Sequence, residues 1–189
     1  MIKITETNLK DCFVLEPKRF GDERGYFSQY FTLSDFKDAG IPFEGVVQAN
    51  RSKSGKGIVR GLHFQKDPYC QAKIVECVHG AVLDCVVDIR EGSPTYGDWT
   101  SVLLTPENGK QLFVPRGFAH GFVSLKDDTL FQYLVDNVYA PLSEGGIAWD
   151  DPDINIDWQF DEYGITTPVL SEKDSKRLTL KQSPTYFKY

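Results

Sequence analysis

The chain has 189 residues, which is enough for one domain with a sizeable hydrophobic core. Its formal net charge of −6 argues against non-specific nucleic-acid binding, although a few local cations can still meet one phosphorylated ligand. No apolar run is long enough to span a membrane and no signal-peptide pattern follows Met1, so we do not expect a membrane protein. The cysteines form no CxxC pair, so we expect neither a disulfide framework nor a zinc site, but free thiols in a reducing cytoplasm.

The N-terminal part of the chain predicts short strands and one short helix. Apolar residues at 13–16 and 26–31 favour strands, and a charged turn that contains glycine lies between them. Residues 35–39 follow Thr32 and Ser34, either of which can cap a short helix. A glycine and a proline directly after this segment are expected to end the helix.

Strand patterns follow one another through the middle of the chain. Residues 51–56 predict a polar loop, and His79 and Gly80 predict a hairpin turn. Short strands joined by glycine and proline turns are typical of an all-β sandwich or barrel. The predicted strands cover residues 46–50, 57–65, 74–78, 81–89, 99–104, 111–114, 121–125 and 129–135.

Residues 140–189 change in character, and we expect them to cover the barrel, so that residues 1–189 form a single domain. The acidic run at 150–157 can suggest a calcium loop, but a proline and the apolar interruptions favour a plain solvated loop. Ser171 is predicted as the N-cap of a short helix, with Asp174 in the capping-box position.

One predicted strand places Arg60 and His63 three residues apart. Alternate side chains of a strand share a face, so these two should point to opposite faces unless the chain twists or bulges at Gly61. Lys73 and His120 follow on neighbouring predicted strands. A base, a cation and a second imidazole that come together in this way can form a site for proton chemistry.

Two glycine-anchored segments, residues 57–63 and 109–120, resemble the two halves of the cupin pattern. Metal-binding cupins carry His-x-His and then Glu in the first half and one His in the second. Here a lysine stands where the Glu ligand is expected, and a protonated lysine repels a divalent metal and has no lone pair to offer. We therefore expect a cupin-type double-stranded β-helix, or jelly roll, with short peripheral helices and no metal. The four ligand places hold His63, Gln65, Lys73 and His120.

Six motifs, taken in this order, resemble those of the dTDP-4-dehydrorhamnose 3,5-epimerases over roughly residues 12–175. The resemblance implies a jelly-roll homodimer that acts on a nucleotide-linked 4-keto-6-deoxy sugar without a metal or an organic cofactor. The motifs are residues 22–27 (DERGYF), 48–52 (QANRS), 60–65 (RGLHFQ), 84–90 (DCVVDIR), 115–122 (PRGFAHGF) and 149–152 (WDDP).

The same resemblance implies four catalytic roles. The protons on C3 and C5 of such a sugar lie next to the C4 ketone, so their removal leaves an enolate, and inversion needs a base on one face and an acid on the other. The resemblance places the base at His63, whose imidazole suits neutral pH, and the proton donor at Tyr133. Lys73 would stabilise the enolate oxygen, and Asp174 would orient the base.

A set of substrate-binding residues also follows from the resemblance. Tyr139 is expected to stack on thymine, and Phe20 to do so from a partner subunit. Gln29 stands where the family usually has Glu, which affects one nucleotide contact but no catalytic role. Arginine suits phosphate because its planar donors bind two oxygens at once. The other matching positions are Arg24, Gln48, Asn50 and Arg60 for the nucleotide, phosphates or sugar, His120 for the sugar, and Glu144 and Lys173.

Outside this context the same residues have simpler interpretations. Tyr133 alone would fill the core, Lys73 alone would guard an edge strand against aggregation, and Asp174 alone would only start a helix. His79 is expected to be solvated. Asp84 can be either a partner of the imidazoles or an exposed residue.

The activity that the resemblance implies is inversion of C3 and C5 of dTDP-4-dehydro-6-deoxy-D-glucose, which gives dTDP-4-dehydro-L-rhamnose. We expect a dimer to which residues 1–45 contribute. One alternative is an epimerase that acts at one carbon or on another nucleotide-sugar, and another is a metal-dependent cupin oxygenase. A non-catalytic nucleotide-sugar binding module is a third, but binding alone needs no acid–base pair.

Overall fold

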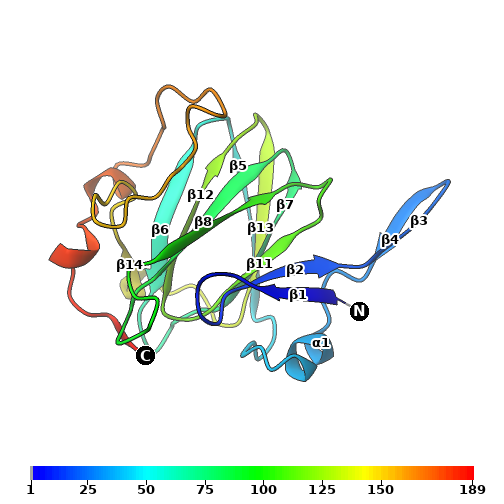
Figure 1. Ribbon diagram of the computed structural model, residues 1–189, viewed down its shortest axis with the longest axis horizontal. Coiled ribbons are helices and arrows are strands. Elements are labelled where there is room, and N and C mark those ends of the chain that lie inside the picture. Colours follow the sequence, from blue (N-terminus) through cyan, green and yellow to red (C-terminus); the bar gives the residue numbers. More distant parts are fainter. Residues whose placement is uncertain (1) are drawn as a thin grey trace.

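Two antiparallel β-sheets stack face to face in the computed structural model of the protein, which describes residues 2–189 (Figure 1). This arrangement confirms the prediction of an all-β jelly roll, because neighbours in each sheet are mostly distant in the sequence. The six-stranded sheet contains, in spatial order, β1 (Ile2–Glu6), β2 (Phe13–Pro17), β11 (Gln111–Val114), β7 (Lys73–His79), β13 (Thr129–Val135) and β5 (Gln48–Ser54). The five-stranded sheet contains β10 (Trp99–Leu104), β8 (Val82–Asp88), β12 (Phe118–Ser124), β6 (Val59–Gln65) and β14 (Glu144–Gly146).

Short elements surround this sandwich. A hairpin of β3 (Arg19–Asp22) and β4 (Gly25–Ser28) projects from one end of the molecule (Figure 1). β9 (Arg90–Glu91) pairs in parallel with β15 (Phe187–Lys188). The helical elements of residues 2–189 are α1 (Leu33–Asp38) and the 3-10 turns η1 (Pro141–Ser143), η2 (Asp174–Lys176) and η3 (Leu180–Gln182).

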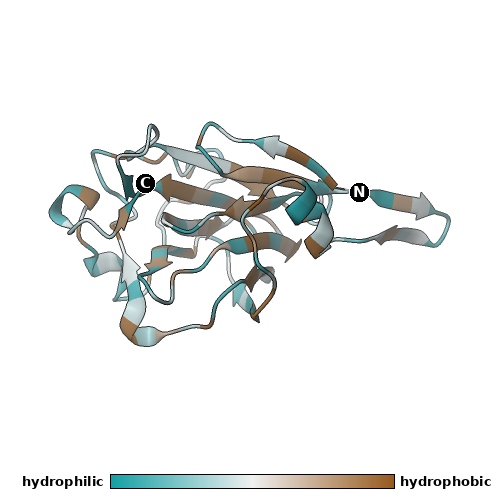
Figure 2. Ribbon diagram, turned by 90° about the horizontal axis from the view of Figure 1, so that it is seen from below, coloured by the Kyte–Doolittle hydropathy of each residue, from teal (hydrophilic) through white to brown (hydrophobic). Residues whose placement is uncertain are grey.

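Strand β8 shows how the sequence pattern builds the core. Val82 and Val86 pack between the two sheets, whereas Leu83 and Val87 pack on the outer face of the five-stranded sheet. Every residue of β8 is buried, because apolar side chains from the C-terminal part of the chain cover that outer face. Figure 2 shows apolar stretches on the stacked strands and hydrophilic ones in the loops around them. The covering residues include Ile147, Ile154, Trp158, Ile165 and Phe187.

The segment around α1 covers part of the outer face of the six-stranded sheet. Phe36 and Phe43 pack edge-on against Phe113 of β11, with ring centroids 6.3 and 6.2 Å away. Thr32 occupies the N-cap position of α1 but its hydroxyl makes no capping hydrogen bond, so packing holds this short helix in place. No helix of residues 2–189 has the length and apolar character needed to cross a bilayer.

Two predictions in the strand-rich region are wrong. β5 runs on to Ser54, through most of the predicted polar loop, because it pairs with β13 along its whole length as an edge strand that tolerates polar side chains. The predicted hairpin at Gly80 is a crossover, since β7 and β8 lie in different sheets. Gly80 has φ +83°, and a Cβ there would lie 2.3 Å from Thr129 Oγ1, so glycine permits the tight crossing. The neighbouring His79 is exposed, as expected.

The acidic run at 150–157 is not solvated throughout, which corrects the sequence interpretation. Asp151 is buried and accepts backbone N–H groups from Asp153 at 2.9 Å and from Leu180 at 2.6 Å. Its carboxylate therefore ties this loop to η3 near the C-terminus.

Candidate active site

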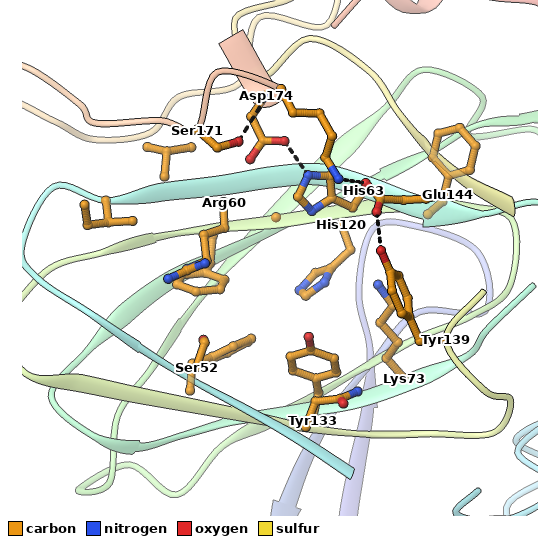
Figure 3. Close-up of a pocket in the computed structure, with 18 of the residues that line it drawn as sticks. Ser52, Arg60, His63, Lys73, His120, Tyr133, Tyr139, Glu144, Ser171 and Asp174 are labelled. Carbon is orange, nitrogen blue, oxygen red and sulfur yellow. Dashed lines mark hydrogen bonds and ion pairs between the residues drawn. The ribbon is translucent and has the colours of Figure 1, made fainter. Parts of the chain in front are cut away.

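A cavity of about 770 Å³ opens between the two sheets (Figure 3). Strands β5, β6, β7, β12 and β13 supply its walls, and residues 169–174 lie over it. Volumes of about 300–1,000 Å³ are usual for small-molecule sites. Several charged and hydrogen-bonding side chains converge on this space, so it suits a polar ligand.

A close approach of β6 and β12 shapes one wall of the cavity. Gly61 has φ +135°, and a Cβ there would lie 2.6 Å from the Cα of Gly121. The register between the strands shifts between His120 and Phe122. This irregularity lets both Arg60 and His63 line the cavity, as a bulge at Gly61 would require.

The imidazole of His63 is held by a carboxylate from the far end of the chain. His63 Nε2 lies 2.5 Å from Asp174 Oδ1 (Figure 3). Burial raises the pKa of the Asp174 carboxyl, but the hydrogen bond and charge of His63 outweigh this, so the net pKa lies below its usual value. Ser171 Oγ accepts the backbone N–H of Asp174 at 3.1 Å, although η2 starts only at Asp174. The predicted capping contact therefore exists, while the Asp174 side chain turns to His63.

Tyr133 and Lys73 face the cavity from the six-stranded sheet. The Tyr133 hydroxyl points into the cavity from the wall opposite His63 (Figure 3). Burial raises the pKa of this phenol, and the charge of Arg60 opposes the shift only in part, so Tyr133 is protonated at neutral pH. Burial lowers the pKa of the Lys73 amine to about 8, with Asp84 among the groups that oppose the shift. Lys73 is therefore mostly an ammonium at neutral pH.

A second imidazole–carboxylate pair lies deeper in the cavity. His120 Nε2 is 2.9 and 3.0 Å from the two carboxylate oxygens of Asp84, which is fully buried. Burial raises the pKa of Asp84, and the charges of His120 and Lys73 counter this only in part. Asp84 is thus a partner of an imidazole, which decides between its two sequence interpretations.

The mouth of the cavity is organised around Glu144. Its Oε2 accepts the Tyr139 hydroxyl at 2.8 Å, and its Oε1 accepts the Lys173 ammonium. Burial raises the pKa of Glu144, but these hydrogen bonds outweigh it and the net pKa is lowered. Gln48 Oε1 accepts the backbone N–H of Tyr139 at 3.0 Å, and Gln48 Nε2 donates to Asn50 at 2.7 Å. These contacts make a polar rim beside a half-exposed aromatic ring.

The donor set does not fit a metal ion. Residues 2–189 contain no group of three or more His, Cys, Asp or Glu side chains placed to hold one. His63 and His120 each direct Nε2 to a carboxylate of their own. The side-chain amide of Gln65 is hydrogen-bonded to backbone groups: its nitrogen donates to two carbonyls, and its oxygen accepts the N–H of Ala140 at 2.7 Å.

Comparison with known proteins shows to which family the chain belongs. The family model described as dTDP-4-dehydrorhamnose 3,5-epimerase matches residues 6–182. The chain belongs to this epimerase family. It is 49% identical over 183 residues to the dTDP-4-dehydrorhamnose 3,5-epimerase of Sinorhizobium fredii, covering 96% of this chain and 91% of the relative.

Solved structures of the epimerase family share the fold. A dTDP-6-deoxy-D-glucose-3,5-epimerase from Legionella pneumophila, in complex with dTDP-4-keto-L-rhamnose, is 38% identical with a TM-score of 0.93, covering 100% of this chain and 99% of that one. A 3′-monoepimerase from Streptomyces bikiniensis, in complex with dTDP-quinovose, is 35% identical with a TM-score of 0.84, covering 93% and 86%.

Most of the residues expected from the epimerase resemblance line one cavity, although they come from seven separate segments of the chain. This convergence is a finding of the structure, whereas the role of each residue stays a prediction. The residues brought together are Gln48, Asn50, Arg60, His63, Lys73, His120, Tyr133, Tyr139, Glu144, Lys173 and Asp174.

Three expected residues lie away from the cavity of their own chain. Phe20 and Arg24 belong to the projecting hairpin, and Gln29 follows it directly. All three are exposed, and Arg24 pairs with Asp22 while Gln29 donates to Thr32. None of the three lines the cavity of its own chain.

Some residues of the site carry no signal in the sequence. Phe122 and Phe131 line the cavity, but in the sequence they look like ordinary core residues of strands. Arg177 donates to Glu144 at 2.8 Å, and nothing in its local sequence indicates this contact. Asp84, in contrast, could be found from the sequence, because it is a charged residue within a largely apolar strand.

Proposed function

We propose that this protein inverts C3 and C5 of dTDP-4-dehydro-6-deoxy-D-glucose to give dTDP-4-dehydro-L-rhamnose in dTDP-rhamnose biosynthesis, without a metal or an organic cofactor. The observation that carries the proposal is that His63, paired with Asp174, and Tyr133 face each other across one cavity. Inversion at carbon needs this pair, because a proton must leave one face and return to the other. The family relationship supplies the substrate class.

Each residue has a defined part in the proposed reaction. His63 takes the proton next to the C4 ketone, and Asp174 holds its ring and stabilises the imidazolium that forms. The electrons of the broken C–H bond move to the ketone oxygen and form an enolate. Lys73 faces that oxygen as a cation, which can contribute about 3 kcal/mol of transition-state stabilisation. Tyr133 then delivers a proton to the opposite face of the carbon.

The rim of the cavity suits the nucleotide half of the substrate. Tyr139 offers an exposed ring for stacking on thymine, and Glu144 fixes its hydroxyl. Lys173 and Arg60 are cations with exposed side chains that can meet a diphosphate, and Gln48 and Asn50 of the same cavity carry amide groups. We also place the reaction in the cytoplasm, because all four cysteines are free thiols.

The experiment that tests this function is NMR of the dTDP-4-ketosugar incubated with the protein in D2O. We expect deuterium at both C3 and C5 with inverted configuration at each. A product without exchange at either carbon would overturn the proposal. Deuterium and inversion at C3 alone would support a second candidate, a single-carbon epimerase, which the similarity to a 3′-monoepimerase favours.

A further inference from the structure

Arg177 is a charged residue of the site that the reaction described above does not use. Its Nη2 donates to Glu144 Oε1 at 2.8 Å, and its side chain is only 18% exposed. The guanidinium lies against the backbone of β14, because a Cβ on Gly146 would come within 2.8 Å of Arg177 Nε. Packing therefore fixes this cation, and only a glycine at position 146 leaves room for it.

Two different cations share one oxygen of Glu144. Lys173 has a flexible stem and a side chain that is 56% exposed, whereas Arg177 is packed against Gly146. The second oxygen of Glu144 holds the hydroxyl of Tyr139. An anionic ligand at the mouth of the cavity can therefore draw Lys173 away more easily than Arg177.

We propose that Arg177 is a positioning residue for the nucleotide half of the site. It holds Glu144 in place, so that Glu144 keeps the Tyr139 ring fixed while Lys173 turns to the diphosphate of the substrate. Without Arg177, release of Lys173 would leave the largely buried Glu144 carboxylate without a cation, which is unfavourable. This inference rests on the proposed function, because it assigns a nucleoside diphosphate to the mouth.

The first test is the affinity of Arg177→Gln for dTDP, measured by titration calorimetry. We expect binding to weaken roughly three- to ten-fold, the range of the net contribution of one hydrogen bond. KM should rise in proportion with kcat unchanged, because the side-chain ion pair of Arg177 is with Glu144, which takes no part in the proton transfer. Arg177→Lys should recover part of the loss. The control is Lys176→Gln, which removes a neighbouring cation paired with the exposed Glu172 and should leave dTDP affinity unchanged.

A double-mutant cycle shows whether Arg177 acts through Glu144. In a Glu144→Gln background, Arg177→Gln should cause little further loss of dTDP affinity. An equal loss in both backgrounds would overturn the inference, because Arg177 would then act on the ligand directly or on folding. Unchanged dTDP affinity in Arg177→Gln would overturn it while the proposed function stands. A wild-type protein that does not bind dTDP would overturn both.

Discussion

His63 and His120 each contact a carboxylate through Nε2, yet the surroundings of the two pairs differ. The pKa of Asp174 lies below its usual value, so this carboxylate stays charged beside a His63 ring that is partly open to the cavity. The pKa of Asp84 is raised by burial, and its partner His120 is itself buried. The first pair therefore keeps a charged carboxylate beside a ring that faces the cavity, whereas both members of the second pair are buried.

Replacement of Tyr133 by Phe separates the two proton transfers. The ring and its packing stay, so the free energy of unfolding should change by less than about 1 kcal/mol. We expect inversion to be lost while some hydrogen exchange survives, because His63 can still remove a proton and return it to the same face. The measurement is the ratio of deuterium incorporated with retention to that incorporated with inversion.

His63→Ala is the control for this variant, since it should lower exchange at both carbons by about 10²–10⁴-fold. Inversion by Tyr133→Phe at the wild-type rate would show that water or another side chain donates the proton. Tyr133 would then be a core residue of β13.

Lys73 should cause the activity to fall at alkaline pH. Its amine must be protonated to face an enolate, and its pKa is about 8, so we expect kcat/KM to decline as the pH rises through 8. The folded-state pKa of Lys73 lies below the unfolded value of about 10.4, so its charged form lowers the free energy of unfolding. This destabilisation is complete below about pH 8 and is relieved as the pH rises towards about 10.

Lys73→Met should therefore lower activity by about 10²–10³-fold without lowering stability at neutral pH. Urea unfolding and steady-state kinetics on the same preparation measure the two quantities. A loss of stability comparable to the loss of activity would instead indicate a structural role for Lys73.

At the scale of elements, the contact of β6 with β12 depends on glycine. Gly61→Ala would place a Cβ 2.6 Å from the Cα of Gly121 in a backbone conformation that side chains disfavour. We expect it to destabilise the fold by about 2–4 kcal/mol and to reduce activity, since His63 lies two residues away. Gly92→Ala is the matched control, because Gly92 also has positive φ but no heavy atom within 4 Å of the added Cβ. Equal unfolding free energies for the two variants would contradict this account.

The strands were predictable because alternation and turn residues are local signals. β8, β10, β11 and β13 lie within a residue or two of their predicted ranges or match them. The crossover at Gly80 was not predictable, because a glycine turn looks the same whether the next strand returns to the same sheet or crosses to the other. The family resemblance indicated His63 and Asp174, whereas the contact of Arg177 with Glu144 depends on packing between segments far apart in the chain.

At the scale of the whole molecule, we propose a homodimer in which the β3–β4 hairpin of one subunit reaches the cavity of the other. The support is that the hairpin projects from the sandwich and carries exposed aromatic rings, with Phe20, Tyr26 and Phe27 each more than half exposed (Figure 1). Exposed aromatic clusters of this kind mark interaction surfaces. Phe20 and Arg24 would then complete the partner's site.

A mixing experiment tests this shared site. The His63→Ala variant has a defective cavity and an intact hairpin, whereas the Arg24→Ala variant has an intact cavity and a defective hairpin. If the hairpins are exchanged, a mixed dimer contains one cavity with a complete set of residues, so mixing two nearly inactive proteins should restore activity. Light scattering should show a dimer in each case, and a fully active monomer, or a mixture no more active than its components, would rule out the shared site.

We also propose that the whole chain is one domain, with residues 140–189 as its cover. The support is that Trp158 and Phe187 pack in the same cluster as Val59 of β6 and Val87 of β8. Separate unfolding transitions for the sandwich and the cover would contradict this.

The pairing of His63 with Asp174 joins residues that are 111 positions apart in the sequence. Closing so long a loop costs chain entropy, and the contacts of the docked C-terminal segment offset it. The sandwich can thus assemble around an imidazole that has no carboxylate partner. Regain of turnover during refolding should therefore lag behind the burial of the sandwich core, and the enzyme would become competent only when the last part of the chain has docked.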